Sequence, residues 1–137
     1  MSLRDIRRHI GQLAIAGFAG DAIPPDLRAL AREFDLGGII LFARNVVAPD
    51  QVAELAREAH SLTKELPLWV SVDQEGGRVA RLKAPFTVWP PMQTLGRSGD
   101  EALAARFARA LAAELKAVGI SLEIGRASCR ERVSKQV

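Results

Sequence analysis

Charged side chains and a glycine pair follow directly after a short apolar run in residues 67–81, which read PLWVSVDQEGGRVAR. The β-branched and aromatic residues of 67–72 predict a buried strand. Asp73 stands where that strand ends, and its carboxylate can accept hydrogen bonds from hydroxyl groups. Arg78 and Arg81 add forked donors, and the preceding glycines allow close approach of a ligand. These groups suit a polar, polyhydroxylated ligand at the carboxyl edge of a sheet, where α/β proteins build their sites.

The same spacing also allows a purely structural interpretation, in which Glu75 pairs with Arg78 and ties the loop down. Arg44 and Asn45, which end a second apolar run, can either line the pocket or hold the neighbouring loops. Trp89 can stack on a bound ligand or fill a core. The residues by themselves leave these alternatives open.

Other residue types with catalytic potential carry less weight. His9 lies in a charged segment and His60 follows an apolar stripe, so we expect surface or packing roles for both. Cys129 is the single cysteine, has no partner for an internal disulfide and stands in an atypical terminal segment. No cluster of His, Cys or carboxylate residues has metal-ligand spacing, and we predict no metal.

Apolar runs alternate with amphipathic segments along the chain. Continuous apolar runs predict four strands, at residues 12–19, 38–43, 67–72 and 120–122. Apolar residues at helical spacing predict helices at 3–10, 24–34, 49–64 and 100–118, the last with a capping box from Ser98 to Glu101. A long loop is expected over 84–97. The resulting β-α-β-α-β-α-β order implies a parallel α/β sheet, and both a doubly wound sheet and the beginning of a (β/α)8 barrel fit it.

Composition narrows the class of protein. At 137 residues, with 48% hydrophobic and 26% charged residues, the chain is at most one soluble globular domain. The pI of 9.6 suggests nucleic-acid binding, but residues 123–137 hold two of the three net positive charges. The rest of the chain is nearly neutral, which argues against nucleic-acid binding. We recognise neither a signal peptide nor an apolar span, and predict no membrane association and a cytoplasmic location.

The sequence changes character after Leu122, where it continues EIGRASCRERVSKQV. A natural basic tail is one interpretation. Reverse translation offers another, because a widely used sequencing adapter encodes the beginning of this segment in one reading frame. We therefore predict that residues 1–122 are the natural part of the chain and that 123–137 are a non-native tail, a translated adapter that must be left out of fold reasoning.

The stretch DQEGGRVAR, with GGIILFARN before it and FTVWPPMQTLG after it, resembles the N-terminal domain of family 3 glycoside hydrolases. The resemblance covers residues 10–122 and is closest to the bacterial β-N-acetylhexosaminidases, although the family has Gln where this chain has Ala80. It implies a (β/α)8 TIM barrel, of which this chain would form the first three β/α units and the start of strand four. It also implies that Asp73 binds hydroxyls of the terminal sugar and that Arg81 helps to hold that sugar.

The activity that the resemblance implies is retaining hydrolysis of terminal β-linked N-acetylglucosamine, as in cell-wall recycling, without a cofactor. The partner would be an N-acetylglucosamine-containing sugar or muropeptide, and the oligomeric state stays open. The resemblance places the nucleophile and the acid/base group on later parts of the barrel, so we expect no catalytic residue here and an inactive chain. Asp73 and Glu75 stand two positions apart on a turn, whereas a retaining pair needs about 5–5.5 Å across a sugar. The alternatives are a β-glucosidase-like member of the same family and a small non-catalytic sugar-binding module.

Overall fold

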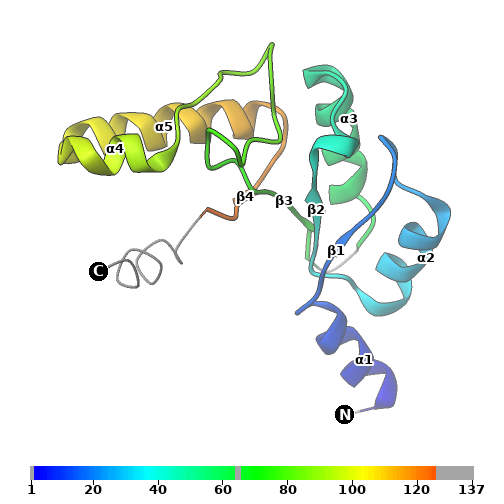
Figure 1. Ribbon diagram of the computed structural model, residues 1–137. Helices are drawn as coiled ribbons and strands as arrows, with labels where there is room; N and C mark the ends of the chain where they lie inside the picture. Colours follow the sequence, from blue (N-terminus) through cyan, green and yellow to red (C-terminus); the bar gives the residue numbers. More distant parts are fainter. Residues whose placement is uncertain (1, 64–65, 126–137) are drawn as a thin grey trace.

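The computed structural model describes residues 2–63 and 66–125, and the strands of this part form a four-stranded parallel sheet (Figure 1). Neighbouring strands in the sheet are also neighbours in the chain, in the order β1 (Ile15–Gly17), β2 (Gly38–Leu41), β3 (Trp69–Val72) and β4 (Leu122–Glu123). A doubly wound sheet reverses its strand order, whereas a barrel adds each strand beside the last. The structure therefore decides between the two predicted architectures, and the sheet is part of an α/β barrel.

Helices connect the strands, and their ends follow local sequence signals. They are α1 (Leu3–Gly11), α2 (Pro25–Phe34), the 3-10 turn η1 (Ala43–Asn45), α3 (Pro49–His60), α4 (Met92–Ser98) and α5 (Glu101–Ala117). Prolines occupy the first turn of α2 and α3, where the helix needs no backbone N–H from them. Ser2 and Asp5 cap α1 reciprocally, each side chain accepting a hydrogen bond from the other residue's amide. No helix in the described part of the chain is both long enough and apolar enough to span a bilayer.

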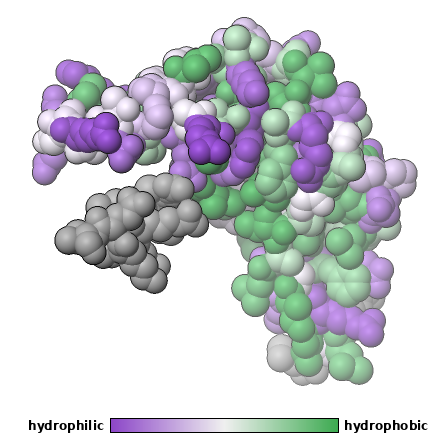
Figure 2. Space-filling view, in the orientation of Figure 1, coloured by the Kyte–Doolittle hydropathy of each residue, from purple (hydrophilic) through white to green (hydrophobic). Residues whose placement is uncertain are grey.

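The two faces of the sheet have different environments. Ile39 and Val70 are fully buried in the core that the sheet forms with α2, α3 and α5. Ile15 and Trp69, which the strand register places on the opposite face, are 43% and 53% exposed. Figure 2 shows hydrophobic surface through the centre and lower part of this view. A segment of a barrel is expected to have these two faces. Helices cover its outer face, whereas its apolar inner face is covered only when the opposing strands are present.

The structure corrects the predicted bounds of several elements. β1 spans only Ile15–Gly17 and is not the buried strand predicted over 12–19, because α1 continues to Gly11 and β1 lies at an edge of the described sheet. The third helix already ends at His60, and β4 begins only at Leu122. The apolar runs extend past these elements into turns: the Leu62 amide, for example, donates to the carbonyl oxygen of Ala59, and the Ile120 amide donates to that of Leu115.

The segment predicted as a loop over 84–97 contains helix α4, which starts directly after two prolines. Ser98 is therefore the last residue of α4 and not the cap of the following helix. Asp100 caps α5 instead, because its carboxylate accepts a hydrogen bond from the Leu103 amide at 2.9 Å. The α4–α5 hairpin extends away from the sheet (Figure 1).

His60 connects three segments of the fold at the end of α3. Its Nδ1 lies 2.9 Å from the carbonyl oxygen of Leu68, just before β3, and its Nε2 lies 3.0 Å from that of Gly119, just after α5. The structure therefore gives His60 the packing role that the sequence predicted.

Replacing His60 with alanine removes both contacts and leaves two carbonyl groups without these partners. We expect the free energy of unfolding to fall by about 2 kcal/mol, which urea denaturation followed by circular dichroism measures. His9 on α1 is exposed, so His9→Ala is the matched control and should change the free energy by less than about 0.5 kcal/mol. Equal effects of the two substitutions would contradict the bridging role.

Candidate functional site

Asp73 and Arg81 meet at the carboxyl end of β3. The Arg81 Nε donates a hydrogen bond to Asp73 Oδ1 at 2.7 Å, and Nη2 donates a second one to Asp73 Oδ2, so that the guanidinium forks onto the carboxylate. This hydrogen bonding raises the pKa of Arg81, and the charges of Asp73 and Glu75 act in the same direction. Both side chains keep part of their surface, 19% for Asp73 and 28% for Arg81. The pair therefore presents acceptors and donors side by side, as recognition of hydroxyl groups requires.

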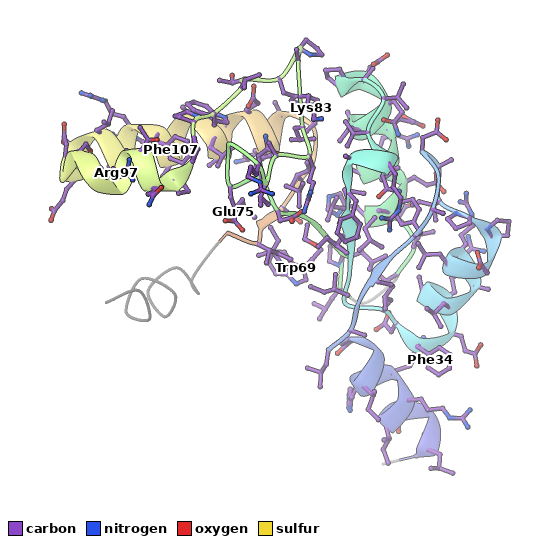
Figure 3. All side chains as sticks on the ribbon, viewed as in Figure 1. Phe34, Trp69, Glu75, Lys83, Arg97 and Phe107 are labelled. Carbon is purple, nitrogen blue, oxygen red and sulfur yellow. The ribbon has the colours of Figure 1, made fainter. Side chains whose placement is uncertain are left out.

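A tight hairpin brings these two residues together across eight positions of sequence. The Glu75 amide donates to the carbonyl oxygen of Val79 at 2.8 Å, and Gly76 and Gly77 adopt positive φ angles of 77° and 57°. The Gly77 amide donates to the carbonyl oxygen of Trp89 at 3.0 Å, which fastens the hairpin to the segment before α4. Figure 3 shows Glu75 on this hairpin near β4, with Trp69 on the open side of the sheet, away from α2 and α3.

Phe42, which the sequence did not single out, stands between two arginines at the end of β2. The guanidinium carbon of Arg44 lies 4.5 Å from the centre of the Phe42 ring, and that of Arg81 lies 5.8 Å from it. Both distances are within the range of cation–π attraction. The Phe42 ring thus connects Arg81, which binds Asp73, to the end of β2. No local sequence pattern predicts this contact.

Arg44 and Asn45 hold the loops around the site. The Arg44 Nε donates to the carbonyl oxygen of Phe18 at 2.8 Å. The buried Asn45 side chain donates to the carbonyl oxygens of Phe18 and Gly20 at 3.2 and 2.5 Å, and accepts a hydrogen bond from the Phe42 amide at 2.9 Å. Of the two predicted alternatives, holding the loops is the one that these contacts support for both residues.

Trp89 fills a core and is not arranged as a stacking platform. Its ring contacts Phe107 of α5 edge-to-face, with centroids 4.9 Å apart and planes at 86°. The indole Nε1 donates to the Glu114 carboxylate at 3.4 Å, and Glu114 also accepts hydrogen bonds from the amide and hydroxyl of Thr87. These contacts hold the segment after the hairpin against α5.

Metal-ligating side chains do not cluster in the described part of the chain. Within residues 2–63 and 66–125 no three His, Cys, Asp or Glu side chains gather as metal ligands would. One open hollow is lined by His60, Lys116 and Glu123 among others, and another lies between β1 and α2. Neither of these two hollows includes Asp73 or Arg81.

Glu123 in β4 lies beside the same hairpin. Partial burial raises the pKa of its carboxyl, and the charges of Glu75 and Asp73 raise it further, against hydrogen bonds from the Gln74 and Gly125 amides. Because the folded state binds this proton more tightly than the unfolded state, the contribution of Glu123 to stability is present below its ordinary pKa of 4.5. The contribution is lost as the pH rises through the folded-state pKa.

We therefore expect Glu123→Gln to stabilise the fold more at pH 7 than near pH 4, because the neutral amide avoids the cost of charging a partly buried carboxyl. Urea denaturation at the two pH values measures this difference. An effect of the same size at both would contradict it. Arg109→Gln, on the exposed surface of α5, is the control whose effect should not follow this pH dependence.

The strands of this parallel sheet follow one another in chain order, and helices cover one of its faces. A carboxylate–guanidinium pair lies at its carboxyl end. These features identify the chain as a segment of an α/β-barrel protein. Residues 5–125 match the profile of the glycosyl hydrolase family 3 N terminal domain, and the chain belongs to this family. The family assignment and the barrel fold predicted from the motifs are thereby confirmed. The match ends at residue 125, so the predicted boundary at Leu122 stays a prediction; residues 126–137, with Cys129, lie outside the described part.

Individual relatives support the assignment. A β-hexosaminidase of Nitrosomonas eutropha is 47% identical over 93 residues, which are 64% of this chain and 26% of the relative. The structure of a family 3 β-N-acetylglucosaminidase from Paenibacillus is 41% identical with a TM-score of 0.80, over 90% of this chain and 23% of that one. NagZ from Neisseria gonorrhoeae, in complex with N-trifluoroacetyl-D-glucosamine, is 34% identical with a TM-score of 0.71, over 80% and 34% of the two chains. The chain thus spans about a quarter to a third of the proteins it matches.

Proposed function

We propose that the complete protein hydrolyses terminal β-linked N-acetylglucosamine with retention, and that Asp73 and Arg81 bind the terminal sugar. The main support for this proposal is the pair of hydrogen bonds between the Arg81 guanidinium and the Asp73 carboxylate at the carboxyl end of β3. Both residues belong to the motif DQEGGRVAR, on which the family resemblance rests. The names of the relatives support the choice of sugar: one is a β-hexosaminidase, another a β-N-acetylglucosaminidase, and a third was solved with an N-acylated glucosamine. In the same proposal the substrate is an N-acetylglucosamine-containing sugar or muropeptide, and the reaction needs no cofactor. The protein acts in the cytoplasm, in cell-wall recycling.

The 137-residue chain itself is inactive in this proposal. Asp73 and Glu75 are neighbours on one hairpin and cannot flank a glycosidic bond as a retaining pair does. A binding site must surround most of its ligand, and Asp73 and Arg81 supply one wall. Residues 123–137 are a non-native tail in the same proposal, which the natural coding sequence would replace by the rest of the barrel.

Turnover of a chromogenic N-acetylglucosaminide tests the proposal. We expect none from the 137-residue chain, and turnover from the completed protein, in which the coding sequence found in source DNA after codon 122 replaces the tail. Turnover by the 137-residue chain would contradict the proposed inactivity. Source DNA that encodes residues 123–137 would contradict the proposed tail.

A matched chromogenic β-glucoside tests the alternative within the family. The completed protein should prefer the N-acetylglucosaminide, because an N-acetyl group adds contacts that a glucoside lacks. A preference for the glucoside would favour the β-glucosidase-like alternative, and sugar binding without turnover of either would favour a non-catalytic module.

A further inference from the structure

Gln74 is a polar side chain that lies almost completely inside the protein, with 1% of its surface exposed. Its Oε1 accepts hydrogen bonds from the Arg81 amide at 2.7 Å and the Leu82 amide at 3.0 Å. Its Nε2 donates to the carbonyl oxygen of Leu82 at 2.9 Å. Three of the four hydrogen bonds that a carboxamide can make therefore go to two consecutive backbone units.

These bonds take the place of a strand ladder. Between the two arms of the hairpin, the backbone pairs directly only at its tip, around Gly76 and Val79. At the base of the hairpin no backbone bond between residues 73–74 and 81–82 is observed, and the Gln74 carboxamide spans that gap. The backbone at Arg81 is thus held by a side chain that follows Asp73 directly in the sequence.

We propose that Gln74 is a positioning residue, which fixes the backbone of Arg81 so that its guanidinium forks onto Asp73. A long arginine side chain has many rotamers, and two forked bonds form readily only when its Cα is already held at the right distance. The Gln74 side chain is buried, whereas Asp73 and Arg81 remain partly accessible, so Gln74 acts on the sugar site only through Arg81. This inference rests on the proposed function, since the position of Arg81 matters for activity only if the pair binds sugar.

Nuclear magnetic resonance of the 15N-labelled 137-residue chain tests the positioning without any sugar. The variant Q74L keeps a similar volume but removes all three carboxamide bonds. We expect exchange of the Arg81 Nε–H proton to become at least about tenfold faster, while the β3 amides stay protected. Q93L, on the exposed surface of α4, is the matched control and should leave the Arg81 signal unchanged.

The variant D73N supplies the reciprocal measurement. It removes the carboxylate, so the Arg81 Nε–H proton loses its protection, but the Arg81 and Leu82 amides should stay protected because Gln74 still holds them. An unchanged Arg81 Nε–H proton in Q74L would overturn the proposal. Equal loss of protection at both amides in Q74L and D73N would overturn it too, since the ion pair would then be holding the backbone.

The variant Q74E covers the case in which Q74L does not fold. Its ionised carboxylate faces the carbonyl oxygen of Leu82 and repels it, whereas the protonated form has both an acceptor and a donor. We expect protection of the Arg81 Nε–H proton to return as the pH falls from about 7 to about 5, and its failure to return would overturn the proposal.

Enzyme kinetics of the completed protein separates this inference from the proposed function. Q74L should lower kcat/KM by about tenfold, mostly through a higher KM, because it disorders a sugar-binding group and leaves the reacting groups in place. An unchanged KM would contradict the effect on sugar binding. Absence of turnover in the unsubstituted completed protein would instead contradict the proposed function, and the exchange measurements would still decide the positioning.

Discussion

Replacing Gly76 with alanine is expected to lower the free energy of unfolding by about 3 kcal/mol or more. Gly76 has a φ of +77°, which costs an L-residue about 1–2 kcal/mol. A Cβ at this position would lie 2.2 Å from the carbonyl oxygen of Pro90 and 2.9 Å from that of Trp89. Both neighbours are backbone atoms of a segment that is tied to α5, so they cannot move aside without breaking other contacts.

Urea denaturation measures this effect, and Gly96→Ala is the matched control. A Cβ at Gly96 in α4 would meet no atom within 4 Å, and alanine is the better helix former, so this substitution should be neutral or stabilise the fold by up to about 1 kcal/mol. Similar destabilisation by both substitutions would show that the hairpin does not need the close approach at Gly76.

Replacing Asp73 with alanine in the completed protein is expected to lower kcat/KM by about a hundredfold to a thousandfold. The substitution removes the charged acceptor proposed for the sugar hydroxyls, and hydrogen bonds to charged groups are each worth about 1.5–3 kcal/mol. It also frees the Arg81 guanidinium, which then loses the orientation that the carboxylate imposes. Both losses affect binding of the terminal sugar in the ground state and the transition state.

Steady-state kinetics with a chromogenic N-acetylglucosaminide measures this effect, with the thermal midpoint recorded for each variant. Asp50→Asn, on the exposed first turn of α3, is the control and should leave kcat/KM unchanged. Arg81→Lys keeps the charge but loses the fork, so its effect should lie between those of the control and Asp73→Ala. Unchanged kinetics in Asp73→Ala would contradict the role of Asp73 in binding.

Local patterns predicted most of the secondary structure because burial on one side imposes a period on the sequence. The prolines at the start of α2 and α3 mark helix starts within one residue, and β3 follows the apolar run before Asp73 closely. The predictions failed where a local signal had two possible uses. Ser98 has the spacing of a helix cap but ends α4, because Asp100 caps α5.

Long motifs in the sequence are enough to assign the family and to place Asp73 and Arg81 after an apolar strand. The three-dimensional structure is needed to see that the strands lie side by side in chain order, that Asp73 and Arg81 bind each other, and that the Gln74 side chain is buried. The two kinds of information differ in how far along the chain they reach. Periodicity records which side of one element is buried, whereas the partner of a carboxylate or a carboxamide depends on how the backbone returns eight residues later, and the sequence holds no local record of that path.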